Sequence, residues 1–91
     1  MDGNDDTKPI PYRALKLVRR VIELGAAKYG DNWMRMEDDK MDFEYCEHAK
    51  HHVCRHEEGR YLDEDTHLPN LAHAAARILL RLEREEKNAG R

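Results

Sequence analysis

The sequence predicts an all-α protein, a compact bundle of three main helices with room for a short fourth. Three observations predict this class. Apolar residues recur at spacings of three and four, Gly and Pro fall at the ends of these segments, and no stretch shows strand-like alternation. The 91 residues have room for one core, so the expected organisation is a single helical domain over residues 10–87. A chain of this size buries a modest share of its surface, and we therefore expect a homo-oligomer.

The first helix is expected over residues 11–29. Pro11 suits its first turn, Gly30 suits its C-terminal stop, and apolar residues recur along one face from Ala14 to Leu24. Residues 31–39 contain the only Trp and an acidic run, which predicts a loop with room for one helical turn.

The second helix is expected over residues 41–58, ending at Gly59. Its apolar face is weak and consists of Tyr45, Cys46, Ala49 and Val53. Cys46 and Cys54 are separated by about 12 Å along this helix, so they cannot form a disulfide. Reduced thiols, and the absence of a signal peptide or transmembrane run, predict a cytoplasmic protein.

The third helix is expected over residues 69–87, with Pro69 in its first turn. Its predicted core stripe consists of Leu71, Ala72, Ala75, Ile78, Leu79 and Leu82. A second, polar stripe lies largely opposite and consists of Asn70, His73, Arg77 and Arg84. That polar stripe must face solvent, a partner subunit or a site, and Arg84 is expected to be plain surface. Residues 1–9 and 88–91 are predicted to be mobile tails.

The charge of the chain argues against two classes of partner. The net charge is −3 with the six histidines neutral, and Lys and Arg are spread along the chain. Neither sign dominates, so composition favours neither bulk nucleic-acid binding nor membrane binding.

Carboxylates and imidazoles are concentrated in residues 59–74. Asp63, Asp65, Asn70 and His73 fall in a short loop and the first turn of the next helix. Mg²⁺ takes oxygen ligands, often one or two carboxylates plus phosphate oxygens, so Asp63 and Asp65 are candidate metal ligands. The alternative is a solvated acidic loop in which Asp65 caps the following helix.

A second line of acid and histidine residues recurs every fourth position upstream, at Glu44, His48, His52 and His56. His52 lies beside the apolar face, where a neutral imidazole can act as a general base or hold a phosphate oxygen. The alternative is a histidine at the edge of the core, hydrogen-bonded to a carboxylate. Zinc is a weaker alternative, because Cys46 and Cys54 do not join the helical His pairs at a turn.

Four further residues could contact a nucleotide. Trp33 could stack on a base and Lys28 could meet a phosphate, with Asn32 beside them; the alternative is that Trp33 is the main aromatic anchor of a small core. Arg77 suits a phosphate oxygen or a carboxylate through paired N–H donors, with solvent exposure as its alternative.

Three of these segments, in this order, resemble the dATP/dGTP diphosphohydrolase N-terminal family of phages and bacteria. They are AAKYGDNW (residues 26–33), then His52, then GRYLDEDTHLPNLAHA (residues 59–74). The family pattern reads KYG-x-x-NW, then Arg-His, then G-E-x-x-D-x-E-T-G-x-x-H-L-A-H-A, and the resemblance spans about residues 10–82. The positions that match are Lys28, Tyr29, Gly30, Asn32, Trp33, His52, Gly59, Asp63, Thr66, Leu71, Ala72 and His73.

The chain also departs from that pattern. Its first motif is one residue shorter. Arg60 stands in place of the family Glu, with only Glu58 nearby to replace it, and Asn70 stands in place of the first His of H-L-A-H. The remaining differences are His51 for Arg, Asp65 for Glu and His67 for Gly.

The resemblance implies a small all-α enzyme, similar to nucleotide pyrophosphohydrolases of the MazG type. Its implied reaction converts a purine deoxynucleoside triphosphate and water to the monophosphate and pyrophosphate, in host cytoplasm if the chain is phage-encoded. The residues that would serve it are Asp63, Asp65 and Glu58 for Mg²⁺ or Mn²⁺, His52, His73 and Asn70 for catalysis, and Lys28, Asn32, Trp33 and Arg77 for substrate. The changes at Arg60 and Asn70 motivate a second hypothesis: a catalytically inactive helical module that binds a nucleotide or a host protein.

Overall fold

The computed structural model describes residues 9–90 and confirms the all-α class, because this part of the chain forms helices and no strand. In chain order the elements are α1 (Tyr12–Tyr29), the 3₁₀ turn η1 (Asn32–Met34), α2 (Asp38–Met41), the π-helical η2 (Asp42–Glu47), α3 (His48–Glu57) and α4 (Asn70–Asn88). The single turn expected within residues 31–39 is η1. Residues 1–8 and 91, which belong to the two predicted tails, lie outside the described residues.

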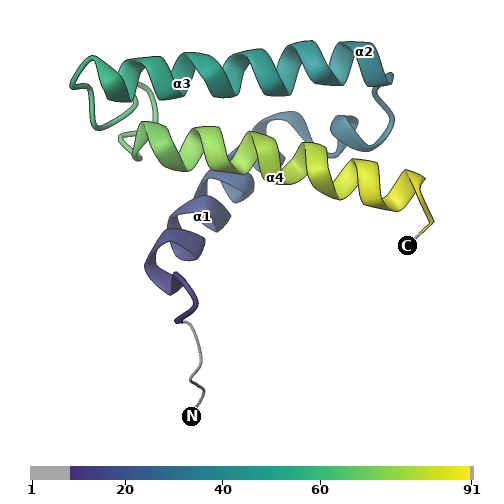
Figure 1. Cartoon of the computed structure of the whole chain (residues 1–91), viewed down its shortest axis with the longest axis horizontal. Helices are drawn as coiled ribbons and strands as arrows, with labels where there is room; N and C mark the ends of the chain where they lie inside the picture. Colours follow the sequence, from purple (N-terminus) through teal and green to yellow (C-terminus); the bar gives the residue numbers. More distant parts are fainter. Residues whose placement is uncertain (1–8, 91) are drawn as a thin grey trace.

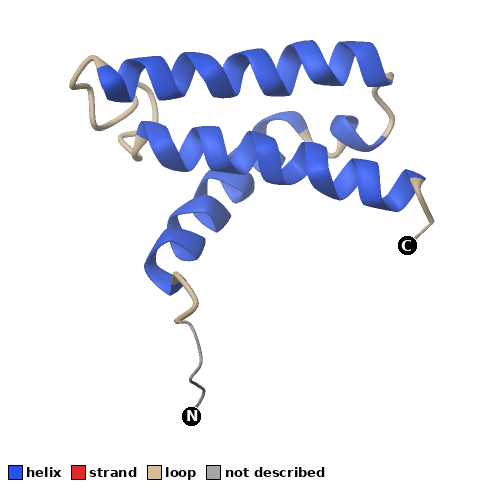
Figure 2. Ribbon diagram, viewed as in Figure 1, coloured by secondary structure: helices blue, strands red, loops and turns tan. Residues whose placement is uncertain are grey.

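Two long antiparallel helical segments dominate the arrangement (Figure 1). α2, η2 and α3 follow one another as one continuous rod, and α4 returns beside that rod after the loop that follows α3. α1 packs on α4 and extends away from the hairpin, as both ribbon views show (Figure 2). The extents are therefore 41 × 39 × 23 Å, and the radius of gyration is 14.7 Å, against about 12 Å for a globular domain of this length.

The rod begins earlier than the sequence predicted, at Asp38 rather than residue 41. Asp38 and Asp39 lie in the first turn of α2, where carboxylates are favoured by the positive end of the helix dipole. The acidic run that suggested a loop is therefore a helix start. The π-helical turn that follows widens the rod at Asp42–Glu47, and such turns are frequent at functional sites.

The helix ends before Gly59, as the sequence predicted, and its end is a Schellman motif. Gly59 has φ of 92°, its N–H bonds to the carbonyl of His56 at 3.0 Å, and the N–H of Arg60 bonds to the carbonyl of Arg55 at 2.9 Å. A glycine suits this position because a side chain there would be strained. The motif turns the chain sharply into the loop that precedes α4.

The predicted core stripe of α4 is wrong at every position except Ala72, which is buried as predicted. Leu71, Ile78, Leu79 and Leu82, which we call the outer face, are between 44% and 49% exposed, and Ala75 is also exposed. The buried positions of α4 are instead Asn70, Ala72, His73, Ala74 and Ala76. Small residues let α4 approach α3 closely, and polar side chains occupy much of the space between the two helices.

The inner face of α4, which consists of Asn70, His73, Arg77 and Arg84, is thus turned toward the rest of the chain. The prediction that Arg84 is plain surface is also wrong. Its guanidinium, 11% exposed, donates to the carbonyl of Trp33 at 2.8 Å and to the carbonyl of Met36, and it pairs with Asp38 at 3.2 Å. Arg84 therefore holds the segment between η1 and α2 against α4.

α4 begins at Asn70, directly after Pro69, rather than with Pro69 in its first turn. No side chain caps this helix, so Asp65 does not have the capping role that was its alternative interpretation. Across residues 9–90, no helix is long and apolar enough to cross a membrane.

Candidate functional site

A cavity of about 640 Å³ lies between the second half of α1, η1, the rod and α4. It gathers most of the residues that the sequence singled out, from five separate segments: Lys28, Asn32, Trp33, His52, Asp63, Asp65, His73 and Arg77. Its volume lies within the range of small-molecule pockets. Two predicted residues are not in its wall. Asn70 is fully buried behind it, and Glu58 lies at the exposed end of α3 in a 3.8 Å contact with Arg60.

Two buried histidines form the back wall of this cavity. His52 from α3 and His73 from α4 stack with their ring centroids 4.7 Å apart and their planes 13° from parallel. They are 7% and 9% exposed. Of the i, i+4 repeat on the second predicted helix, Glu44, His48 and His52 line this cavity, and His52 is the member that stacks on His73.

Asn70 fixes the orientation of His52. Its Nδ2 donates to the carbonyl of Arg60 at 2.9 Å, so its Oδ1 is the acceptor that lies 2.8 Å from Nδ1 of His52. Nδ1 of His52 therefore carries a proton, and in the neutral ring Nε2 is left as the basic nitrogen. Asn70 therefore contacts His52 directly and also lines the small cavity described below, and its catalytic role stays a prediction.

Both histidines favour the neutral form. Burial lowers the pKa of His52, and the hydrogen bond to Asn70 only partly opposes this effect. Burial also lowers the pKa of His73, with a further lowering from His52 itself and only partial opposition from Asp63. Arg77 and Arg55 add positive charge near both rings. Two neutral imidazoles at pH 7 can accept protons, which is the state that a general base requires.

Asp63 organises the loop that leads into α4. Its Oδ2 accepts the backbone N–H of Asp65 at 3.1 Å, the backbone N–H of Thr66 at 3.0 Å and the hydroxyl of Thr66 at 3.2 Å. Burial by itself would raise the pKa of Asp63, but these hydrogen bonds and the nearby His73 together lower it. The carboxylate therefore stays ionised through the neutral range.

Thr66 joins the acid to the second histidine. Its Oγ1 lies 2.7 Å from Nε2 of His73, and the same Nε2 lies 3.9 Å from Oδ2 of Asp63. The loop closes through His67, whose φ of 61° is left-handed and whose N–H bonds to the carbonyl of Asp63 at 2.9 Å. A left-handed residue at this turn explains why the resembling family carries Gly there.

The donor set of the loop fits a hard divalent cation. Within residues 9–90, no group of three or more His, Cys, Asp or Glu side chains is arranged to hold a metal ion. Mg²⁺ commonly takes only one or two carboxylates and completes its shell with water and phosphate oxygens. Asp63 and Asp65 both line the cavity, and the Asp65 carboxylate has no ion pair or hydrogen bond with another described residue. Cys46 and Cys54 are free thiols, as predicted.

Arg77 is the α4 residue that brings a positive charge to the cavity wall. Its Nη1 donates to the carbonyl of Glu44 in the π-helical turn at 3.3 Å, and its guanidinium carbon lies 5.7 Å from the ring centroid of Tyr45. Its Nε is buried without a hydrogen-bond partner among the described residues. The side chain is therefore held in place by η2 while it keeps a free donor and its full charge.

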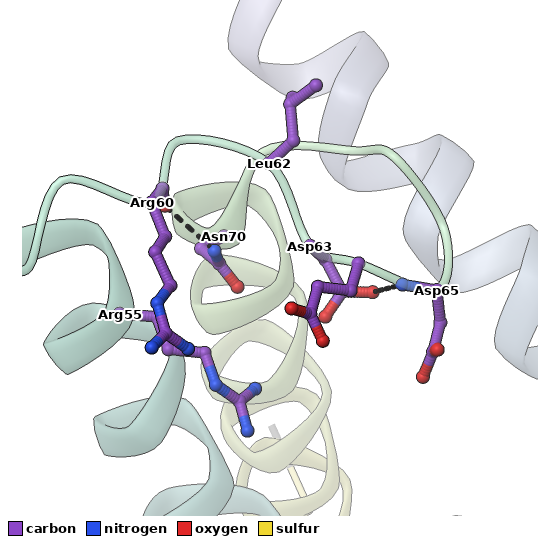
Figure 3. Close-up of a pocket in the computed structure, with 7 residues that line it drawn as sticks. Arg55, Arg60, Leu62, Asp63, Asp65 and Asn70 are labelled. Carbon is purple, nitrogen blue, oxygen red and sulfur yellow. Dashed lines mark hydrogen bonds between the residues drawn. The ribbon is translucent and has the colours of Figure 1, made fainter.

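A second, smaller cavity of about 130 Å³ adjoins the first and shares Arg55, Asp63 and Asp65 with it. Figure 3 shows the arginines Arg55 and Arg60 on one side of this cavity and Asp63 and Asp65 on the other. Neither arginine was predicted from the sequence as a site residue, and Arg60 was noted only because it replaces the family Glu. Arg55 could have been found, because it lies three residues after His52 and therefore on the same side of the helix.

Comparison with known protein families matches residues 2–90 to the family described as dATP/dGTP diphosphohydrolase, N-terminal. No curated protein and no solved structure gives a significant match. The family match covers nearly the whole chain, and it includes the loop and helix start that hold Asp63, Asn70 and His73. The chain therefore belongs to the dATP/dGTP diphosphohydrolase N-terminal family.

Proposed function

We propose that this chain hydrolyses the purine deoxynucleoside triphosphates dATP and dGTP to the monophosphate and pyrophosphate, with Mg²⁺ or Mn²⁺. The observation that carries this proposal is the buried His52–Asn70 and His73–Thr66–Asp63 network at the wall of a nucleotide-sized cavity. A polar network of this kind is costly to bury and is expected where chemistry requires it.

The reaction assigns a role to each side of the cavity. A water oxygen forms a bond to the α-phosphorus, the bond from that phosphorus to the α,β-bridging oxygen breaks, and pyrophosphate leaves with the electron pair. His52 takes the proton of the attacking water at Nε2, because Nδ1 is held protonated by Asn70. Arg77 offers its charge to the phosphates, and Trp33 offers an aromatic surface to the base.

The metal would be held by Asp63 and Asp65. When bound, it neutralises phosphate charge and assists the attack of water. Glu58 lies outside both cavities, paired with Arg60, so its part in the metal site would require the end of α3 to rearrange.

The proposal includes a second copy of the chain. The outer face of α4 leaves Leu71, Ile78, Leu79 and Leu82 at least 44% exposed, and Leu15, Leu17 and Leu24 of α1 are at least 36% exposed. A single helix that carries this many large apolar side chains in water favours association with another apolar surface. An identical chain supplies that surface by two-fold symmetry.

The test is incubation of the purified chain with each of the four deoxynucleoside triphosphates, and with GTP, in Mg²⁺ and then in Mn²⁺. Chromatography should show monophosphate and pyrophosphate from dATP and dGTP, dependent on the metal. His52→Gln should lower the rate by about 10²- to 10⁴-fold. Asp63→Asn should abolish turnover, whereas Asp39→Asn, the same change at an exposed residue of α2, should leave the rate unchanged.

Circular dichroism confirms that each variant is folded. If the folded wild-type chain binds dGTP without releasing any product, the hydrolase proposal fails and the inactive binding module becomes the better account.

A further inference from the structure

Arg55 and Arg60 are brought together by the backbone at the end of α3. In the Schellman motif described above, Arg55 is the third-last helical residue and Arg60 is the third residue after the helix, and the two are joined by the 2.9 Å hydrogen bond between their backbones. These two positions usually carry apolar side chains that contact each other. Here both carry a positive charge.

No short ion pair within the described residues neutralises these two charges, although the carboxylates of Asp63, Glu64 and Asp65 line the same small cavity. Arg55 has no ion pair and no side-chain hydrogen bond to another of residues 9–90. Arg60 is 60% exposed and meets only Glu58, at 3.8 Å. The free carbonyls at the C-terminal end of α3 carry partial negative charge, which offsets part of the positive charge of the two arginines. Two guanidinium groups that line the same small cavity can together bind an anion with several oxygens, because each presents a planar fork of N–H donors.

The position of the pair identifies the anion. Arg55 lines both cavities, and so do Asp63 and Asp65, whereas Arg60 lines only the small one. A triphosphate whose nucleoside part occupies the large cavity therefore passes the two carboxylates and ends beside the arginines. The small cavity, with cations on one side and carboxylates on the other (Figure 3), suits a phosphate chain that is shared with a divalent cation.

We propose that Arg55 and Arg60 bind the β- and γ-phosphates of the substrate and hold the pyrophosphate product until it leaves. This inference rests on the proposed function. Arg55 contacts the phosphates at the junction of the two cavities, and Arg60 closes the far end. Asn70 supports the site from below, because it fixes the backbone of Arg60 through the 2.9 Å bond to its carbonyl. The site selects the pyrophosphate end of the nucleotide and is indifferent to the base.

The experiment measures binding by isothermal titration calorimetry to the full chain in Mg²⁺, with three separate ligands: inorganic pyrophosphate, inorganic phosphate and dGMP. The variants are Arg55→Gln, Arg55→Lys, Arg60→Gln and the double variant Arg55→Gln/Arg60→Gln. Arg19→Gln is the matched control, because Arg19 is an exposed arginine that pairs with Glu23 on α1 and lines neither cavity.

The double variant should bind pyrophosphate about ten- to a hundredfold more weakly than the wild-type chain, while dGMP affinity changes by less than about twofold. Arg55→Lys should lose part of this affinity, because it keeps the charge without the fork. The single variant Arg60→Gln should fold normally, because the side chain of Arg60 is exposed and its hydrogen bonds to α3 are made by the backbone. A loss of pyrophosphate binding in this variant would therefore not be due to misfolding.

The inference is overturned if folded variants bind pyrophosphate as tightly as the wild-type chain does, or if dGMP binding falls by the same factor. It is also overturned if the wild-type chain binds no pyrophosphate. These results are separable from those of the turnover assay. Arginine-dependent binding of pyrophosphate without hydrolysis of any nucleotide supports the site and refutes the enzyme, and turnover with unaffected pyrophosphate binding does the reverse.

Discussion

The two faces of α4 reverse the usual arrangement of a small helical protein, in which apolar side chains are buried and polar side chains are exposed. The inner face carries Asn70, His73, Arg77 and Arg84, and it packs against the rod, the loop and η1. The outer face carries Leu71, Ile78, Leu79 and Leu82, each at least 44% exposed. α4 therefore buries hydrogen-bonded polar groups on one side and leaves large apolar side chains exposed on the other, the side on which we propose that a second chain packs.

The largest expected effect comes from the outer face. Ile78→Glu/Leu82→Glu, two changes one turn apart on that face, should convert a dimer to a monomer, because each places a charge in the proposed interface. Light scattering after size exclusion should then show half the wild-type mass. Lys16→Gln/Arg20→Gln on α1 alters the net charge equally and should leave the mass unchanged. A wild-type chain that is already monomeric at high concentration would refute the assigned role of the outer face.

On the inner face, Asn70→Ala should lower the free energy of unfolding by about 3 kcal/mol. The change leaves Nδ1 of His52 and the carbonyl of Arg60 without partners and opens a cavity where a fully buried side chain stood. Urea denaturation measures it. Leu71→Ala, the adjacent residue on the outer face, is the comparison, made in the Ile78→Glu/Leu82→Glu background so that association does not contribute. An equal or larger loss at Leu71 would reverse the contrast between the faces.

Further along the inner face, Arg84→Met should cost about 2 kcal/mol, because it removes a charged donor from two backbone carbonyls while keeping the length of the side chain. The fluorescence of Trp33 should also shift, since its carbonyl is one of the two partners. Arg81→Met removes a pair with Asp42, which is 55% exposed, and should cost less than about 1 kcal/mol. Similar losses for the two arginines would show that Arg84 does not hold η1.

The smallest effect is the dependence of stability on pH. Burial lowers the pKa of His52 and of His73 below the ordinary value of 6.5, so the unfolded chain binds protons first as the pH falls. Their contribution to stability is therefore complete above 6.5 and is lost below it, by up to about 1.4 kcal/mol per pH unit for each histidine. Urea denaturation between pH 8 and pH 5 should show this decline, and a His73→Gln variant should show less of it. A stability that rises toward pH 5 would contradict the neutral, buried state of the pair.

The helices themselves could be predicted from the sequence. Spacings of three and four, with Gly30 and Gly59 at the C-terminal ends, placed the helices to within a few residues. The positions of Asp63, His52 and His73 in one site followed from the family resemblance, and the structure brings all three to the same cavity.

The facing of α4 could not be predicted, because helical periodicity assigns the apolar stripe to the core of the same chain. That rule does not hold when small residues such as Ala72 and Ala76 fill the contact with α3 and the large apolar residues face outward. Arg84 was misjudged for a related reason. Its partners, the carbonyls of Trp33 and Met36, are roughly fifty residues away in the chain, and no local sequence pattern predicts contacts over such a separation.

The central claim is that the inner face of α4 is the nucleotide site. Its most direct test is NMR of the histidine imidazole resonances while dGTP and Mg²⁺ are added. The titration is made with the wild-type chain and with the His52→Gln and Asp63→Asn variants. We predict that the ring signals of His73, and of His52 where it is present, shift and saturate with the nucleotide, because both rings form the wall of the cavity. The ring signal of His67, which is exposed and lines neither cavity, should stay in place. If saturating dGTP moves neither His52 nor His73, the inner face of α4 is not the nucleotide site.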